Sequence, residues 1–249
     1  MPPGLSVWSV CILLASSVGT AFISTALGLG GGVLLLAIMT LFLPVVAVIP
    51  LHGVIQLGSN AGRAVLGWRR VQFPVLAAFG AGCIGGTVLG AQVLRELPPG
   101  WLEVALGTFI AWTCLGRLPA ISAMSRGRIA AGGAITGALT LFVGATGPLV
   151  ATLIRALRLD RRAHVRTFAA CMVVQHGLKI AVFGLAGFVY APYAGFLAAM
   201  IGVGLLGTWL GGHVLERMRE QVFQRLLTLL LLLLAARLLY VGLREVMIL

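Results

Sequence analysis

Acidic side chains are what this sequence most lacks. Its 249 residues include six Asp and Glu, against 18 Lys and Arg, and one lysine in all. Charged residues make up 10% of the chain, whereas a soluble globular domain typically has about 25%. Hydrophobic residues reach 60%, and the mean hydropathy is +1.08. This composition excludes a soluble globule and indicates an integral membrane protein.

The few acids are also absent from the interiors of the apolar runs. Each lies in a predicted loop or at the end of a run: Glu96, Glu103, Asp160, Glu216, Glu220 and Glu245. Without an intramembrane carboxylate, the chain has no good ligand for Na⁺ or for a hard metal cation, which argues against a cation or metal permease.

Other functional motifs are missing as well. The four cysteines, Cys11, Cys83, Cys114 and Cys171, are far apart and form no CxxC or Cys/His pattern, so we predict no metal site and no cofactor. The sequence has no H-E-x-x-H motif, phosphate loop or Ser/His/Asp order, so we predict that it is not an enzyme.

The net charge of +12 would suggest nucleic-acid binding in a soluble protein. Here most cations lie in short loops between apolar runs, where they set membrane orientation, so we predict no nucleic-acid partner. Placing the loop at Arg69 in the cytoplasm leaves two arginines outside, Arg95 and Arg244, and puts thirteen inside: Arg69, Arg70, Arg117, Arg126, Arg128, Arg155, Arg158, Arg161, Arg162, Arg166, Arg217, Arg219 and Arg225.

The apolar runs predict an all-α membrane protein with about eight spans. Six runs have roughly the 20 residues that a spanning helix needs: 45–67, 72–94, 101–118, 167–187, 192–214 and 222–243. Two others, 5–43 and 129–157, are each interrupted by a Gly cluster, so we interpret each as a hairpin whose second arm is a half-helix. The N-terminal run has no preceding Lys or Arg and leads into the first cluster, so we interpret it as a retained span and not a signal peptide.

The chain repeats itself. G-L-G-G-G-V-L from Gly28 aligns with G-A-T-G-P-L-V from Gly144 at an offset of 116 residues, and G-T-x-x-G from Gly86 recurs at Gly207. We therefore predict a first repeat at 1–118, a cytoplasmic linker at 119–128 and a second repeat at 129–249. A hairpin plus three crossings gives each repeat an odd count, so the two copies should insert with opposite topology, as in many transporters.

Glycines in a membrane helix can serve close packing or interrupt the helix. Each of the two clusters opens a short helix, and free N–H groups at such a start can bind an anion. The first cluster is Gly28, Gly30, Gly31 and Gly32, and its counterpart is Gly144, Gly147 and Pro148. Both interpretations stay open. If the clusters are anion sites, we expect them to meet near the bilayer centre.

Two cations recur at equivalent positions inside apolar runs. Arg63 follows Ser59 and Asn60 by about one helical turn, and Lys179 follows Gln175 and His176 in the same way. An unpaired cation there costs at least about 2.5–3.5 kcal/mol. Arg63 could extend to the membrane interface instead, close to Trp68. Lys179 lies near the middle of its run, so a substrate anion or backbone carbonyls must compensate it.

These residues resemble the sulfite exporter TauE/SafE family of anion permeases. The resemblance lies in G-L-G-G-G-V-L-L-L, in the stretch from Gly58 through Arg63 to Trp68-Arg69-Arg70, in G-G-T-x-x-G, and in their second-half counterparts, and it covers about residues 15–243. It implies transport of sulfite, sulfonates or related organosulfur anions across the bacterial inner membrane.

We accordingly predict a multi-pass secondary transporter that moves a small anion by alternating access. Its partners would be the anionic substrate and the lipid bilayer, with the proton as candidate coupling ion; the sequence leaves the oligomeric state open. The alternatives are a permease for a non-sulfur organic anion and an accessory or assembly protein of a membrane complex. The predicted substrate-binding residues are Gly28, Gly30, Gly31, Gly32, Ser59, Asn60, Arg63, Thr146, Gly147, Gln175, His176 and Lys179.

Overall fold

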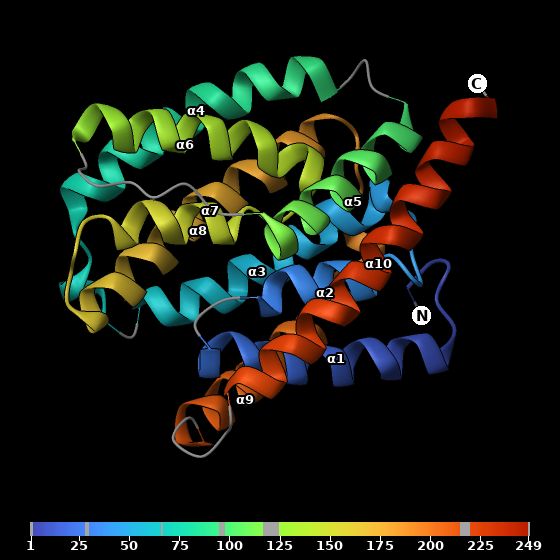
Figure 1. Ribbon diagram of the computed structural model, residues 1–249, viewed down its shortest axis with the longest axis horizontal. Helices are drawn as coiled ribbons and strands as arrows, with labels where there is room; N and C mark the ends of the chain where they lie inside the picture. Colours follow the sequence, from blue (N-terminus) through green and yellow to red (C-terminus); the bar gives the residue numbers. More distant parts are fainter. Residues whose placement is uncertain are drawn as a thin grey trace. The chain divides into compact units, whose positions relative to one another are not determined.

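A computed structural model describes residues 2–27, 30–65, 67–94, 98–116, 125–214 and 220–248 (Figure 1). The described part consists of helices and connecting turns and contains no strand. This confirms the predicted all-α class. Alternating polar and apolar residues, which would favour a sheet, are missing from the long apolar runs, and backbone groups inside a membrane must be hydrogen-bonded within their own segment.

The long helices of the described residues correspond closely to the six uninterrupted apolar runs and, in α1 and α6, to the first arms of the two interrupted runs. They are α1 (Val7–Leu27), α3 (Val45–Val65), α4 (Phe73–Leu94), α5 (Pro99–Leu115), α6 (Arg126–Val143), α8 (Arg161–Leu185), α9 (Ala194–Val214) and α10 (Glu220–Ile248). Among the described residues, α1, α3, α4, α8 and α9 each contain a segment long and apolar enough to cross a membrane. Two short 3₁₀ helices, η1 (Trp68–Arg70) and η2 (Ala191–Tyr193), lie in the connections.

Two short helices follow the predicted Gly interruptions. They are α2 (Gly31–Met39) and α7 (Gly147–Arg155), each with nine residues. Nine residues rise about 14 Å, roughly half of a hydrocarbon core. Gly30 and Gly144, just before the new helices, have φ angles of 97° and 69°, which favour glycine because a Cβ would be strained there.

The chain divides into two compact units, and each draws helices from both halves of the sequence. One unit comprises Met1–Ile49, Leu97–Arg117 and Ala191–Leu249, and the other comprises Pro50–Glu96 and Leu118–Tyr190. The two Gly interruptions belong to different units, so their meeting near the bilayer centre stays a prediction. The opposite insertion of the two repeats and the repeat boundaries also stay predictions.

In the second unit, α4 packs along α6, and the two helices lie side by side in Figure 1. Glycines on α4 allow this close approach. A Cβ at Gly82 would lie 2.9 Å from the Cα of Ala130, and one at Gly86 would lie 2.6 Å from the Cα of Ala134. Small residues at such crossings let backbones pack tightly in a membrane.

The first unit repeats this arrangement with other helices. There α9 packs along α1, and a Cβ at Gly207 would lie 3.0 Å from the Cα of Val18. Gly207 is the repeat counterpart of Gly86. In each unit, therefore, the long arm of a broken hairpin packs against a glycine-bearing helix from the other half of the sequence. The repeated G-T-x-x-G motif has a packing role at both positions.

The start of α8 differs from the prediction. The sequence placed a loop at 155–166 and the helix at 167–187, whereas α8 already begins at Arg161. Asp160 explains the early start, because its Oδ1 accepts hydrogen bonds from the backbone N of Arg162 at 2.9 Å and of Ala163 at 3.0 Å. This is an N-cap, which stabilises a helix by about 1 kcal/mol.

The adjacent glycines Gly85 and Gly86 provide a matched test of the α4–α6 contact. A Cβ at Gly86 would overlap the carbonyl oxygen of Ala134, whereas one at Gly85 would meet nothing within 4 Å. We expect Gly86→Ala to destabilise the protein by about 1–3 kcal/mol through overpacking. Gly85→Ala should leave the melting temperature in detergent unchanged. Equal melting temperatures for the two variants would contradict the assigned contact.

Candidate functional site

The candidate site lies where α8 contacts the interruption between α6 and α7, inside the second unit. Lys179, in the last third of α8, is 0% exposed. Its Nζ donates a hydrogen bond of 2.8 Å to the carbonyl oxygen of Gly144, the residue at which α6 ends. The positive φ of Gly144 accompanies the end of the helix, where carbonyls lose their partners within the helix. The hairpin interruption thus supplies the acceptor that a buried ammonium needs.

Gln175 makes a second link between α8 and the same hairpin. Its Nε2 donates to the carbonyl oxygen of Thr136 on α6 at 2.6 Å and to Oγ1 of Thr146 at 2.8 Å. Thr146 is the N-cap residue of α7 and is fully buried. Gln175 Oε1 has no hydrogen-bond partner among the described residues. One side chain therefore holds both arms of the interrupted hairpin against α8.

On its other side, α8 approaches α3 at His176 and Lys179. The rings of His176 and His52 lie edge to face with their centroids 6.0 Å apart. A Cβ at Gly53 would lie 2.7 Å from Lys179 Cε, so glycine at this position leaves room for the lysine stem. His176 is 1% exposed, and its Nδ1 has no hydrogen-bond partner in the described part of the chain.

These residues form a buried polar cluster, which we define as His52, Gly144, Thr146, Gln175, His176 and Lys179. Lys179 is the one lysine or arginine of this cluster, and its hydrogen bond to Gly144 uses one of the three donors of an ammonium group. The described residues contain no group of three or more His, Cys, Asp or Glu that could hold a metal ion. A buried basic side chain with polar neighbours and no carboxylate is suited to an anion.

The polar residues predicted in the first copy make different contacts. Arg63 donates from Nε to the carbonyl oxygen of Ser59, and from its NH2 group to Ser59 Oγ, both at 3.3 Å. Asn60 Nδ2 donates to the carbonyl oxygen of Gln56 at 2.8 Å. All three side chains thus bond to their own helix, α3.

The predicted glycines are distributed over both units. Gly28 lies outside the described residues, and Gly30, Gly31 and Gly32 belong to the first unit. A Cβ at Gly31 would overlap the carbonyl oxygen of Thr20 on α1, which gives this glycine a packing role. Gly147 begins α7 in the second unit, where a Cβ would meet only Phe168, at 3.9 Å.

Comparison with known protein families identifies the group to which the chain is related. The family model for the sulfite exporter TauE/SafE matches residues 12–238, nearly the whole chain. The chain belongs to the TauE/SafE family. Members of this family are membrane transporters, and together with the long apolar helices this makes the chain a multi-pass membrane transport protein. No curated protein and no solved structure matches the chain significantly.

Four residues in or next to the polar cluster of this TauE/SafE protein were not among the predicted site residues: His52, Gly53, Thr136 and Gly144. His52 has no counterpart in the other copy, so the repeat gave it no support. Gly53 and Thr136 look like ordinary packing residues in the sequence. The Gly144 carbonyl is a backbone group, so no residue type in the sequence indicates it. A hint was available for Gly144, because the acceptor of an intramembrane lysine must come from a carbonyl when acids are missing.

Gln175 allows a test of the link between α8 and the hairpin. Gln175→Met should leave the Thr146 hydroxyl without its partner and lower stability by about 0.6–2 kcal/mol, the usual range for interhelical hydrogen bonds in membranes. The matched control is Gln56→Met on α3, where the structure shows no hydrogen bond from the side chain. Melting temperatures in detergent should fall for Gln175→Met alone. A similar fall for both variants would mean that Gln175 does not hold the hairpin.

Proposed function

We propose that this TauE/SafE member is a secondary transporter that moves a small sulfur oxyanion or organosulfonate across the bacterial inner membrane by alternating access. The observation that carries the proposal is the burial of Lys179 beside the hairpin interruption, with a neutral carbonyl as its hydrogen-bond partner. Family membership supports an anion of the sulfite type.

The chemistry of this pair favours exchange with an anion. A carbonyl oxygen satisfies one N–H of the ammonium but does not neutralise its charge. An oxyanion is a stronger acceptor, because its negative charge also attracts and neutralises the ammonium. A sulfite or sulfonate oxygen can therefore compete with Gly144 for Lys179. His176 Nδ1, which has no partner among the described residues, lies three positions before Lys179 on α8 and can donate a hydrogen bond to an anion when it carries a proton.

The buried charge also explains selectivity against cations. An isolated ammonium inside a membrane costs at least about 2.5–3.5 kcal/mol, and a bound anion offsets that cost. A cation would increase it, since the polar cluster contains no carboxylate. The substrate-binding roles of Ser59, Asn60, Arg63, Thr146, Gly147 and the glycines Gly30–Gly32 are part of this proposal. His176 is the proposed carrier if a proton is the coupling ion.

Alternating access would use the two interrupted hairpins. Lys179 and Gln175 each link α8 to the interruption between α6 and α7. An anion that binds Lys179 in place of the Gly144 carbonyl would therefore loosen one of the two links that hold the hairpin. We propose that the hairpin then moves relative to α8 and changes the side from which the cluster is accessible. If the two repeats insert with opposite topology, the inward-open and outward-open states would be structurally equivalent.

Lys179→Met is the main test of this function. Methionine keeps the length and removes the charge, so the variant should fold with an unchanged or raised melting temperature. Sulfite or taurine flux in proteoliposomes should fall by about 30-fold or more, corresponding to roughly 2 kcal/mol for removal of one member of a buried charge pair. Lys179→Arg should retain part of the flux, because the planar guanidinium keeps the charge but not the geometry.

Arg63→Met serves as the comparison variant, since Arg63 bonds to its own helix. Its flux should fall less than that of Lys179→Met. If Lys179→Met retains flux but melts at a lower temperature, the lysine is structural and the anion-site proposal fails. Normal flux in both variants, with loss of an associated membrane complex, would favour the accessory-protein alternative.

A further inference from the structure

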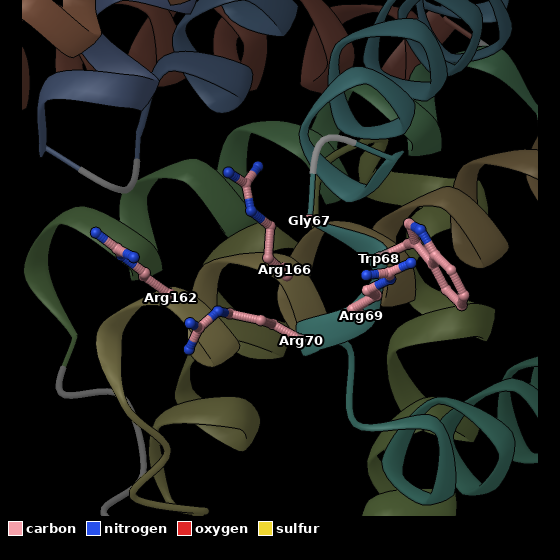
Figure 2. A pocket seen from close by; sticks show the side chains of 6 residues that line it. All are labelled: Gly67, Trp68, Arg69, Arg70, Arg162 and Arg166. Carbon is pink, nitrogen blue, oxygen red and sulfur yellow. The ribbon is translucent and has the colours of Figure 1, made fainter.

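A second cationic site lies in the second unit, at the end of α8 remote from Lys179. A cavity of about 550 Å³ is lined by Gly67, Trp68, Arg69, Arg70, Arg162 and Arg166. The first four residues come from η1 and the residue before it, and the last two come from the first turns of α8. Figure 2 shows the four arginine side chains around this cavity.

The two segments that form the cavity are fixed to each other. The backbone N of Gln72, just after η1, donates to Oγ1 of Thr167 on α8 at 3.0 Å. One guanidinium nitrogen of Arg166 donates to the carbonyl oxygen of Arg63. A Cβ at Gly67 would lie 2.9 Å from Arg166 Cδ, so the glycine lets this side chain cross the backbone closely. Arg166 is therefore held in place by packing and a hydrogen bond, and the segments that carry the other arginines are joined to each other.

In the described part of the chain, the four guanidinium charges around the cavity exceed the acidic charge beside them. Arg69 lies over the Trp68 ring, 5.7 Å from its centroid, and Arg166 bonds to a neutral carbonyl. Asp160 is the nearby acid, and hydrogen bonds from the backbone N of Ala163 and Arg162, together with the charges of Arg70 and Arg162, lower its pKa. Its carboxylate caps α8 instead of pairing with a guanidinium. Because the four guanidinium groups repel one another, the cavity strongly favours binding of a multivalent oxygen anion.

The surroundings of the cavity indicate where such an anion comes from. Trp68 is 58% exposed, and the nearby apolar side chains of Val65 and Phe73 are 70% and 54% exposed. Exposed Trp beside arginine is typical of the membrane interface. The charge distribution of the chain places this loop on the cytoplasmic side, where the leaflet is rich in anionic lipids. Arginine also matches phosphate oxygens with two parallel hydrogen bonds.

We propose that this arginine cavity binds the phosphate group of an anionic phospholipid headgroup. Trp68 and the exposed apolar residues beside it would contact the glycerol and upper acyl region, while Arg70, Arg162 and Arg166 would contact the phosphate. Orientation rules alone explain an excess of arginine in this loop. They do not explain why arginines from two segments 92 or more residues apart surround one cavity.

The test compares lipid binding by the purified full-length protein and by Arg70→Gln/Arg162→Gln. Phosphatidylglycerol or phosphatidylcholine is titrated into the detergent-solubilised protein, and bound lipid is measured by native mass spectrometry. We expect the double variant to bind phosphatidylglycerol about tenfold or more weakly, since each interfacial arginine contributes about 1 kcal/mol. Phosphatidylcholine binding should not change. Circular dichroism checks that the variant is folded.

The matched control is Arg126→Gln/Arg155→Gln, which removes two exposed arginines that do not line the cavity. It should retain phosphatidylglycerol binding. An equal loss in both double variants would show general charge attraction and overturn the proposed site. A further titration uses inorganic phosphate without lipid. If millimolar phosphate displaces phosphatidylglycerol and binds the wild type as tightly, the site is one for free phosphate, and the lipid assignment is wrong.

Discussion

The need to satisfy a buried ammonium governs the arrangement around the candidate site. Lys179 is fully buried in α8, and its hydrogen-bond partner is the carbonyl of Gly144. That carbonyl is available because α6 ends at Gly144 and α7 begins three residues later. A continuous helix would have used the carbonyl for its own backbone. The interruption therefore supplies the acceptor that the buried lysine needs, and Gln175 links α8 to the same junction.

Close helix packing holds this junction in position. Gly82 and Gly86 on α4 bring the α6 backbone into direct contact, and α6 is the arm that presents the Gly144 carbonyl. The first unit uses Gly207 in the same way against α1. This equivalence between the units is what two related repeats would produce. It also explains why the G-T-x-x-G motif occurs twice in a chain whose other polar residues differ between copies.

Much of the fold could be predicted from sequence because bilayer thickness fixes helix length. The predicted runs 45–67 and 72–94 correspond to α3 at Val45–Val65 and α4 at Phe73–Leu94. The start of α8 was missed because the arginine-rich stretch looked like a loop, whereas Asp160 caps the helix there. The division into two units was also not predictable, because each unit contains helices from both halves of the chain and only tertiary packing determines this grouping.

The candidate site was predictable in part. Lys179, Gln175 and Thr146 stood out as polar residues in apolar runs, and the structure connects Gln175 with Thr146 and places Lys179 beside them. Their main acceptors, the carbonyls of Gly144 and Thr136, are backbone groups without a sequence signature. The contact of Gly53 with the lysine stem depends on the approach of α3 to α8, which a single sequence does not reveal.

Ligand-induced stabilisation tests the central claim, that Lys179 is the counter-ion of the transported anion, most directly. The measurement is the melting temperature of the purified wild type and of Lys179→Met with sulfite, thiosulfate, sulfoacetate, taurine or a simple carboxylate. A ligand at 100 times its Kd stabilises the folded state by about 2.7 kcal/mol. The account predicts that at least one sulfur anion raises the melting temperature of the wild type and has no effect on Lys179→Met. Equal stabilisation of both proteins would contradict it.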